Sequence, residues 1–300
     1  MQTKALARYF EILKGKKKPR FQIAKRKGLL DKKIKSAFEI LKSCELCERK
    51  CYVDRTKGKK GFCKAGFDWR IFGAHPHYGE EPELTVSGTI FQAACSMRCC
   101  YCQNAPESIT PELGEIWSIE KVARWIEEMK RFGCRNINWV GGSPTPWLWH
   151  ILSAMKLCKA DIAQVWNSNS YYSEKTSELL KDVVDIYLLD FRYFNEKCAI
   201  RLSSVPRYPQ VAKRNFLAAR KDSEMLIRVL VMPNHIECDA KPILKWIKDN
   251  LGAWTRVNVM EQYYPTWQAN KFPEINRKLT AEEYSDVFKY AKNIGLKNLV

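Results

Sequence analysis

The run Cys95-Ser-Met-Arg-Cys99-Cys-Tyr-Cys102 decides the fold of this chain. It follows an apolar, strand-like segment, Leu84 to Ala94, and its C-x3-C-x2-C spacing puts three thiolates on one short loop. Thiolates are the usual ligands of iron–sulfur clusters, and a cubane cluster has four irons. Three ligands leave one iron open to a substrate or cofactor, so the loop predicts a reactive centre rather than a structural one.

After this loop, short apolar or β-branched runs alternate with helical patterns. The candidate strands are residues 85–92, 136–140, 162–166, 184–190, 225–232 and 256–261. The candidate helices are residues 118–132, 146–158, 173–182, 209–220, 241–251 and 280–293. Buried runs of this kind are typical of parallel strands joined by right-handed crossovers. Six units predict an α/β fold with an open, partial (β/α)6 TIM-like barrel, because a closed barrel needs eight.

The chain divides into three predicted parts. Residues 1–43 form a basic N-terminal segment with helices at about 5–13 and 31–43. Residues 44–83 form a cysteine-rich extension that is rich in glycine and loops, and residues 84–300 form the barrel. Within the extension, His75-Pro-His77 offers a spare ligand, and Gly79-Glu-Glu-Pro82 is expected to shape the linker into the barrel.

Composition limits the kind of protein this is. Hydrophobic residues make up 46% of the 300 residues, which predicts a folded core, but no apolar run is long enough to cross a membrane. The N-terminal sequence has no signal-peptide pattern. Twelve cysteines without an export signal indicate metal binding in a reducing compartment, so we expect a cytoplasmic protein.

Charge is unevenly distributed along the chain. The net charge is +18, and residues 1–35 carry 13 Lys or Arg against Glu11 and Asp31. Such a segment is either a solvated, lysine-rich helical surface or a binding surface for nucleic acid. Both interpretations stay open at this point.

A second set of cysteines, Cys44-x2-Cys47-x3-Cys51-x11-Cys63, also has metal-ligand spacing. Four thiolates suit either an auxiliary [4Fe–4S] cluster with full protein ligation or a closed structural zinc ion. The C-x2-C-x3-C part is nearer to ferredoxin spacing than to paired zinc knuckles, which favours iron–sulfur. In either case the metal would stabilise a segment too small for a core of its own.

The three-cysteine spacing, with Tyr101 before the last cysteine, resembles the signature of the radical S-adenosylmethionine (radical SAM) superfamily. The wider sequence resembles a poorly characterised branch related to the pyruvate formate-lyase activating enzyme. The stretches that carry this resemblance are Cys44 to Cys63, Gly79-Glu-Glu-Pro82, Gly88-Thr-Ile-Phe91, Cys102-Gln-Asn104, Asp185 to Asp190, Met232-Pro-Asn-His235 and Met260 to Pro265.

The resemblance implies that Cys95, Cys99 and Cys102 hold a [4Fe–4S] cluster whose open iron binds SAM. Reductive cleavage of SAM would give a 5′-deoxyadenosyl radical that abstracts hydrogen from a substrate, and the activating-enzyme relatives imply a glycyl residue of a partner protein as that substrate. An electron donor of flavodoxin or ferredoxin type would be needed. Two alternatives remain: a radical SAM enzyme that modifies RNA, and a zinc-stapled nucleic-acid-binding protein without catalysis.

The resemblance also implies a set of SAM-binding residues at the ends of the strands. In Gly141-Gly-Ser-Pro144, Ser143 replaces the acid of the family's Gly-Gly-Glu-Pro motif, and a backbone contact would survive that change. In Asp190-Phe-Arg192, arginine replaces a lysine, which keeps the charge but changes the geometry. The implied residues are Tyr101, Gly141, Gly142, Ser143, Asn167, Ser168, Asn169, Asp190 and Arg192.

The other cysteines and His235 are expected to have structural roles. Zinc ligation by the loop with Cys100 as fourth ligand is disfavoured, because adjacent side chains point apart. We expect Cys100 to be a small buried residue and His235 to be a structural hydrogen-bonding group. The scattered thiols, expected to be core or surface groups rather than ligands, are Cys134, Cys158, Cys198 and Cys238.

Overall fold

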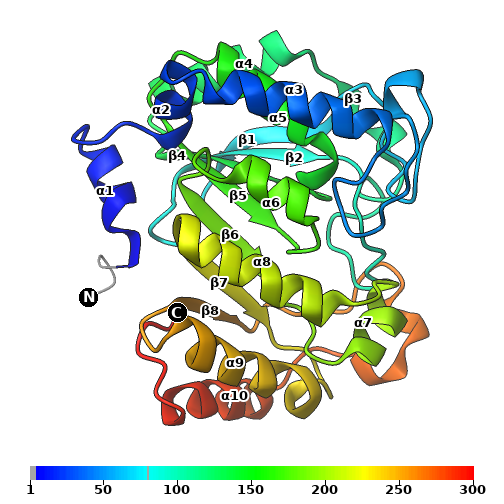
Figure 1. The fold of residues 1–300 in the computed structure, drawn as a ribbon. Coiled ribbons are helices and arrows are strands. Elements are labelled where there is room, and N and C mark those ends of the chain that lie inside the picture. Colours follow the sequence, from blue (N-terminus) through cyan, green and yellow to red (C-terminus); the bar gives the residue numbers. More distant parts are fainter. Residues whose placement is uncertain (1–4, 80) are drawn as a thin grey trace.

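The computed structural model describes residues 5–79 and 81–300 of the chain and contains one eight-stranded sheet (Figure 1). The strand order is β3-β1-β2-β4-β5-β6-β7-β8. The strands are β1 (Arg70–His77), β2 (Ser87–Gln92), β3 (Glu115–Ile116), β4 (Asn136–Gly141), β5 (Ala163–Ser168), β6 (Ile186–Asp190), β7 (Glu224–Leu230) and β8 (Arg256–Met260). Because the two end strands do not pair with each other, the sheet is a partial barrel, as the count of units predicts.

Six strands, β2 and β4 to β8, run parallel and confirm the predicted α/β alternation. Their registers align the ends of the strands, so that Gln92 pairs with Gly141 and Asp190 with Arg228. Each strand is buried on both faces, which explains why the sequence shows continuous apolar runs instead of alternation. The carboxyl ends of these strands consequently form one edge, at which the site lies.

Ten α-helices are described, and all except the first lie on the outer side of the sheet (Figure 1). They are α1 (Ala7–Leu13), α2 (Arg20–Arg26), α3 (Leu29–Lys42), α4 (Ile119–Phe132), α5 (Leu148–Leu157), α6 (Glu174–Leu180), α7 (Glu196–Ser203), α8 (Tyr208–Asp222), α9 (Lys241–Leu251) and α10 (Ala281–Asn293). Ser118, Ser173 and Thr280 cap the N-termini of α4, α6 and α10 through their side chains. The prediction missed α2 and α7, which are both short.

Residues 44–83, which we expected to be rich in loops, also contain a strand, β1, that the sequence did not predict. Residues Arg70–His77 pair antiparallel with β2 over its whole length and carry the short strand β3 on their other side. Gly73 and Pro76 inside this run are residues typical of turns, so the sequence pattern did not indicate a strand there. The sheet therefore includes part of the extension, upstream of the expected barrel boundary at residue 84.

The beginning of the chain covers the end of the sheet where the parallel strands start (Figure 1). Leu6, Tyr9 and Ile12 pack against a small apolar cluster from the barrel interior. The cluster consists of Leu84, Ala163, Val165, Ile186, Leu188 and Leu226. The backbone N–H groups of Arg8 and Tyr9 donate to the carboxylate of Glu224 at 2.6 and 2.8 Å. Part of the basic N-terminal segment is thus a structural plug.

Several basic side chains of the same segment are also paired internally. Arg20 forms ion pairs with Asp182, at 3.1 Å, and with Asp222. The Lys33 ammonium donates to the carbonyl of Glu178 at 2.7 Å. Through these contacts, some basic side chains of the N-terminal segment stabilise the fold. Other lysines of the segment are exposed to solvent.

The loop between β1 and β2 connects the two ends of the open sheet. Glu81 accepts from Arg228 of β7 at 2.7 Å and from Asn258 of β8 at 3.1 Å, and Arg256 donates to Glu83 at 2.7 Å. All of these side chains are largely buried, and breaking one such pair leaves an uncompensated charge. The expectation that Gly79-Glu-Glu-Pro82 shapes the linker agrees with this, while Glu80 lies outside the described residues.

Residues 1–4, which begin the N-terminal sequence, also lie outside the described residues. Within the described ranges, no helix combines the length and the apolar character that crossing a bilayer requires.

Candidate functional site

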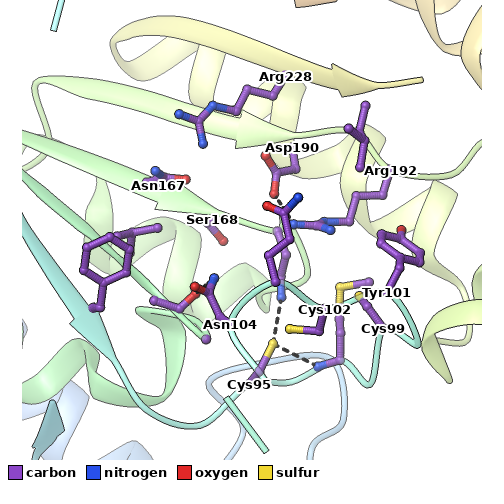
Figure 2. Close-up of a pocket in the computed structure, with 18 of the residues that line it drawn as sticks. Cys95, Cys99, Tyr101, Cys102, Asn104, Asn167, Ser168, Asp190, Arg192 and Arg228 are labelled. Atoms are coloured by element: carbon purple, nitrogen blue, oxygen red, sulfur yellow. Dashed lines mark hydrogen bonds and ion pairs between the residues drawn. The ribbon is translucent and has the colours of Figure 1, made fainter. Parts of the chain in front are cut away.

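A pocket opens at the carboxyl ends of the parallel strands and contains most of the predicted site residues (Figure 2). Of the predicted residues, those that line it are Cys95, Cys99, Tyr101, Cys102, Gly141, Gly142, Asn167, Ser168, Asn169, Asp190 and Arg192. These residues follow β2, β4, β5 and β6, so the common edge of the strands brings them together.

The three-cysteine loop leaves β2 immediately after Gln92 and turns beneath the barrel wall. The indole N–H of Trp147 donates to the carbonyl of Ala93 at 2.6 Å, and Ala94 has a left-handed backbone with φ of +69°. The N–H groups of Arg98 and Cys100 donate to carbonyls at the end of α7, at 2.9 and 2.8 Å. In Figure 2 the sulfurs of the three cysteines face the pocket, whereas Cys100 is buried and does not line it.

Each of the three sulfurs has a hydrogen-bonding neighbour. The Cys95 sulfur accepts from the Met97 N–H at 3.4 Å and from the Asn169 amide at 3.5 Å. The Ser203 hydroxyl donates to the Cys99 sulfur at 3.0 Å, and the Cys102 sulfur lies 3.3 Å from the Ser108 hydroxyl. Hydrogen bonds of this kind stabilise thiolate charge and tune a bound metal centre.

Burial determines the protonation of these thiols when no metal is bound. Desolvation, and then the neighbouring Cys99, raises the pKa of Cys95 to about 12. Desolvation also raises the pKa of Cys99, while the Arg192 guanidinium acts in the opposite direction. The free thiols of Cys95 and Cys99 are therefore protonated at neutral pH, and a bound metal ion or cluster would have to displace their protons.

Gly141 and Gly142 lie where no side chain fits. A Cβ on Gly141 would lie 2.0 Å from the backbone nitrogen of Gln92, and φ there is +113°. A Cβ on Gly142 would lie 2.3 Å from the carbonyl oxygen of Ala94. The two glycines allow the β4 loop to approach the cysteine loop closely. Ser143 does not line the pocket, because its hydroxyl turns back to accept from the Thr145 N–H at 3.3 Å.

The run Asn167-Ser-Asn-Ser170 lies at the carboxyl end of β5, whose last two residues are Asn167 and Ser168. Asn167, Ser168 and Asn169 all line the pocket, and Figure 2 shows the first two near its centre. The Ser168 hydroxyl also accepts from the Ser170 N–H at 3.2 Å, and the side-chain oxygen Oδ1 of Asn169 accepts from the Tyr171 N–H at 3.0 Å. The run is thus both a polar pocket wall and a cap on the strand.

Asp190 and Arg192 form an ion pair of 2.6 Å at the end of β6. The guanidinium Nε of Arg192 is buried without a hydrogen-bond partner, as is the side-chain oxygen of Asn138, another pocket residue. Unsatisfied buried polar atoms are costly and rare, so these two atoms indicate a missing polar ligand.

Tyr101 begins a hydrogen-bonded chain that ends at the cysteine loop. Its hydroxyl lies 2.6 Å from that of Tyr193, which lies 2.7 Å from the Ser203 hydroxyl, the group that donates to Cys99. Tyr193 and Ser203 were not singled out from the sequence, because neither belongs to a motif. Only the fold brings α7 against the loop.

The second cysteine set forms a compact hairpin of its own. Cys44 and Tyr52 exchange a backbone hydrogen bond at 3.0 Å, and the Phe62 N–H donates to the Cys51 sulfur at 3.4 Å. A Cβ on Gly61 would lie 2.8 Å from the Cys51 sulfur. Desolvation, and then the charge of Cys63, raises the pKa of Cys47, so these sulfurs are close enough to interact electrostatically.

An aromatic ring joins the two cysteine loops. The guanidinium groups of Arg49 and Arg98 lie 3.7 and 4.5 Å from the centre of the Phe62 ring. Arg49 also donates to the carbonyl of Ser96 at 3.1 Å, and Arg98 donates to that of Phe62. The second cysteine set consequently lies directly behind the three-cysteine loop.

The remaining cysteines do not behave alike. Cys134 and Cys158 are buried, as expected for core thiols. Cys198 and Cys238 are not scattered as the sequence suggested, since their sulfurs lie 4.0 Å apart. His235 forms a hydrogen bond with Asp239 at 3.1 Å, which agrees with a structural hydrogen-bonding role.

Comparison with known proteins identifies the family. Residues 89–247 match the sequence profile of the Radical SAM superfamily. The uncharacterized protein MJ0674 of Methanocaldococcus jannaschii is 40% identical over 275 residues, which cover 90% of this chain and 80% of that protein. The chain belongs to the radical SAM superfamily. It is thus a radical SAM enzyme of a poorly characterised branch, and its family uses a [4Fe–4S] cluster, SAM and a reductant.

Two solved structures share the radical SAM fold with this chain. HydG, a maturase of the [FeFe]-hydrogenase, has a TM-score of 0.52 at 13% identity, covering 99% of this chain and 62% of HydG. Streptococcus suis SuiB bound to its precursor peptide SuiA has a TM-score of 0.50 at 14% identity, covering 68% and 46%. The chain spans less than half the length of SuiB, and these likenesses concern the fold alone.

The pocket of this radical SAM enzyme fits its family's cofactors. Three thiols on one loop, without Cys100, provide the donor set for a cluster with one open iron. The glycine cradle and the two unpartnered polar atoms, on Asn138 and Arg192, provide places for a polar ligand beside it. The site therefore accommodates a cluster and SAM in one continuous space.

Proposed function

We propose that this radical SAM enzyme abstracts a hydrogen atom from a polypeptide, in the manner of an activating enzyme acting on a glycyl residue. In this proposal Cys95, Cys99 and Cys102 ligate the cluster. When bound, the cluster and SAM together supply a 5′-deoxyadenosyl radical as the hydrogen acceptor. The chain itself has to hold the cofactors, exclude water and admit the substrate.

The proposed SAM contacts divide between two sides of the pocket. On one side, the backbone of Gly141 and Gly142 can approach the amino-acid end of SAM without a side chain in the way. On the other side, the ion pair of Asp190 and Arg192 faces the space beside Cys99. The polar groups of Asn167, Ser168 and Asn169 suit a ribose, and Tyr101 closes the wall next to the cysteines.

The shape of the pocket is the observation that supports a polypeptide as the substrate. It extends from the cysteines along the barrel interior to His77 and Phe91, at the side where β1 and β8 do not pair. Tyr264, at the end of β8, lines it and is 46% exposed, and Tyr78 after β1 is 66% exposed. An open side with exposed aromatic residues suits a chain segment that must reach into the barrel.

The comparisons support the same substrate class without establishing it. SuiB, which shares the fold, is solved with a precursor peptide bound, and HydG is described as a maturase of another protein. Both therefore act in connection with polypeptides. For this chain, we infer a peptide segment of a partner protein as substrate, together with a reductant of flavodoxin or ferredoxin type.

We further propose that Cys44, Cys47, Cys51 and Cys63 hold an auxiliary [4Fe–4S] cluster. In the described part of the chain, these sulfurs do not form a group within 4.8 Å of one another, whereas ligands of a single zinc ion would. Each thiolate of a cubane binds its own iron, so wider separations are expected. The Arg49–Phe62–Arg98 stack, which links this set to the three-cysteine loop, supports a role in electron transfer.

The test begins with reconstituted, oxygen-free protein, SAM and dithionite. We expect conversion of SAM to 5′-deoxyadenosine, measured by chromatography and mass spectrometry. Deuterated protein and deuterated RNA, prepared from the same cells, would then be offered separately. Deuterium in the 5′-deoxyadenosine from the protein fraction alone supports the proposal, and deuterium from RNA alone overturns the polypeptide assignment. Absence of SAM cleavage overturns both.

The RNA alternative rests on the basic N-terminal segment and stays a prediction. The structure places α1 at the end of the strands opposite the cysteine loop, so this segment does not border the cofactor pocket. The non-catalytic, zinc-stapled interpretation is set aside, because the chain belongs to an enzyme superfamily. A cytoplasmic location remains an expectation from the cysteine content.

A further inference from the structure

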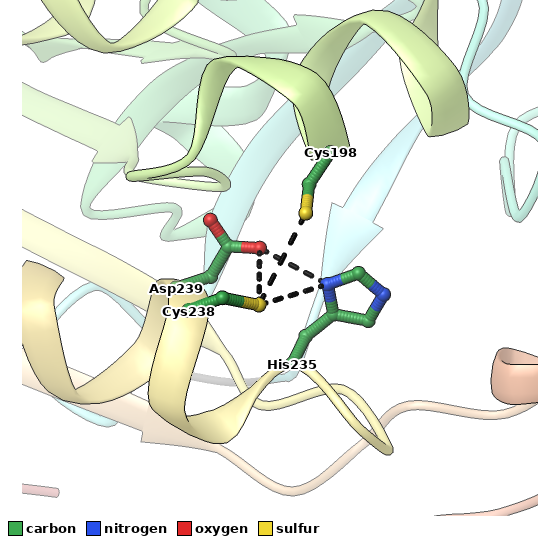
Figure 3. Close-up of side chains that lie close together, drawn as sticks. All are labelled: Cys198, His235, Cys238 and Asp239. Atoms are coloured by element: carbon green, nitrogen blue, oxygen red, sulfur yellow. Dashed lines mark hydrogen bonds and ion pairs between the residues drawn. The ribbon is translucent and has the colours of Figure 1, made fainter.

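Four side chains with metal-binding groups lie together outside the pocket: Cys198, His235, Cys238 and Asp239 (Figure 3). Their ligand atoms all lie within 4.8 Å of one another. Cys198 comes from α7, and the other three come from the turn between β7 and α9. The group therefore connects two helices that are far apart in the sequence.

The turn that carries three of these residues has an unusual backbone. Residues Ile236–Ala240 form a π-turn, in which the carbonyl of His235 accepts from the N–H groups of Asp239 and Ala240 at 3.2 and 3.1 Å. Positions i, i+3 and i+4 share one face of such a turn, so His235, Cys238 and Asp239 point to the same space. Single π-turns are rare and are often found at functional sites.

The separations are close to those around a single tetrahedral ion, which small side-chain adjustments would complete. With Zn–S bonds of about 2.3 Å and Zn–N or Zn–O bonds of about 2.0–2.2 Å, neighbouring ligand atoms lie roughly 3.3–3.8 Å apart. The two sulfurs are 4.0 Å apart, and the Cys238 sulfur is 3.5 Å from His235 Nδ1 and 3.6 Å from Asp239 Oδ2. His235 Nδ1 lies 3.1 Å from the same Asp239 oxygen.

Neighbouring groups orient the ligands before any ion binds. Asp239 Oδ1 accepts from the N–H groups of Phe194 and Asn195 at 2.7 and 2.8 Å, which directs Oδ2 towards the sulfurs and the imidazole. His235 and Asp239 are almost completely buried, while the two cysteines are partly accessible. Oriented ligands with an entry path are what a metal site requires.

We propose that Cys198, His235, Cys238 and Asp239 bind one zinc-type divalent ion that fastens α7 to the turn before α9. Two thiolates, an imidazole and a carboxylate are all zinc ligands, and four of them complete the tetrahedral coordination that structural zinc adopts. This inference is independent of the polypeptide substrate proposed above. It differs from the auxiliary cluster, whose sulfurs are more widely spaced.

The ion has a structural consequence for the cofactor pocket. The end of α7 holds the three-cysteine loop: the carbonyls of Leu202 and Ser203 accept from the N–H groups of Cys100 and Arg98. The Ser203 hydroxyl donates to the Cys99 sulfur at 3.0 Å. An ion bound one turn earlier, at Cys198, would fix the helix that supports this loop.

The test measures metal on the full chain, purified without oxygen. Elemental analysis of the Cys198→Ser/Cys238→Ser double variant is expected to show about one zinc per chain less than wild type, with unchanged iron. A control variant, Cys134→Ser/Cys158→Ser, alters two thiols outside the group and should keep all its zinc. Equal zinc in wild type and the Cys198→Ser/Cys238→Ser variant would overturn the proposal.

A gentler variant separates ligand loss from misfolding. Asp239→Asn keeps the oxygen that accepts from Phe194 and Asn195 but replaces Oδ2, the ligand atom, with an amide. We expect Co²⁺, added as a probe, to bind this variant about tenfold more weakly or worse than wild type, with loss of the tetrahedral absorption bands at limiting Co²⁺. Undiminished bands in this variant, with a normal near-ultraviolet dichroism spectrum, would contradict ligation by Asp239. A Cys198–Cys238 disulfide in anaerobic wild-type protein would overturn the whole site.

Discussion

The two cysteine loops lie side by side but are built in opposite ways. The sulfur contact of the Cys44–Cys63 hairpin is local, because the Phe62 N–H that donates to the Cys51 sulfur is close in sequence, and distant residues such as Thr176 bond to the hairpin backbone instead. The Cys95–Cys102 loop depends on distant parts of the chain, since Asn169 and Ser203 hydrogen bond to its sulfurs. A closed site can be assembled from one segment, whereas an open one needs the whole barrel to shape the space beside it.

The largest effect is expected from removing the open site. A Cys95→Ala/Cys99→Ala/Cys102→Ala variant should lose all measurable SAM cleavage and about four irons per chain, if each site holds a cubane cluster. Iron quantification and 5′-deoxyadenosine formation would be measured together. A loss of about eight irons per chain would show that the Cys44–Cys63 hairpin does not bind its metal when the first site is missing. The two sites would then not be independent.

The hairpin can be disturbed without touching a ligand. Gly61→Ala would place a Cβ 2.8 Å from the Cys51 sulfur, so we expect reduced metal content in this set and about 1–3 kcal/mol lower stability. Metal analysis and thermal unfolding would measure both quantities. The matched control is Gly66→Ala, whose Cβ would meet nothing closer than the end of Lys60 at 3.7 Å. Equal effects from the two variants would disprove the close approach at Gly61.

The contact between the hairpin and α5 should depend on pH through His150. Burial, and then the charge of Arg55, lowers the pKa of His150 to about 3, and its Nε2–H donates to the Phe67 carbonyl at 2.8 Å. The unfolded chain takes up this proton near pH 6.5 and the folded chain does not. Stability should therefore fall by about 1.4 kcal/mol for each pH unit below 6.5, until pH approaches 3.

A His150→Gln variant tests this prediction, since glutamine can still donate to Phe67 but does not titrate. The difference in melting temperature between wild type and variant should change steadily between pH 7.5 and 5. A constant difference over that range would mean that His150 takes up a proton in the folded protein.

The smallest effect is expected at the hydrogen bond from Ser203 to Cys99. Ser203→Ala removes a donor to the sulfur, and a hydrogen bond is worth about 1 kcal/mol. The cluster should become harder to reduce, by roughly 40 mV for one electron, which redox titration monitored by paramagnetic resonance would detect. Ser153→Ala, which removes a hydroxyl that bonds only within α5, is the control and should leave the potential unchanged.

The sequence predicts the parallel sheet well because its strands are continuous apolar runs between capped helices. All six predicted strands are present, and the expected cofactor residues converge at their ends, except Ser143, whose side chain turns into the β4 loop. The strand β1 was missed because Gly73 and Pro76 look like turn residues. The local sequence pattern of residues 70–77 cannot show that this segment pairs with the free edge of β2.

The partners of the sulfurs could not be predicted in the same way. Ser203 and Tyr193 lie on or beside α7, and no spacing rule relates them to Cys99. The Cys198 group is an intermediate case. His235-x2-Cys238-Asp239 has the spacing of ligands on one helical face, but Cys198 joins it only through the packing of α7.

The plug formed by α1 has a consequence for how the protein is made. The backbone of Arg8 and Tyr9 binds Glu224, more than two hundred residues later, so α1 has no complete docking place until β7 is synthesised. Contacts of such long sequence separation form slowly. The apolar side of α1 stays exposed until β7 is made, and the lysines that follow the helix, Lys14, Lys16, Lys17 and Lys18, favour solubility of the nascent chain during that time.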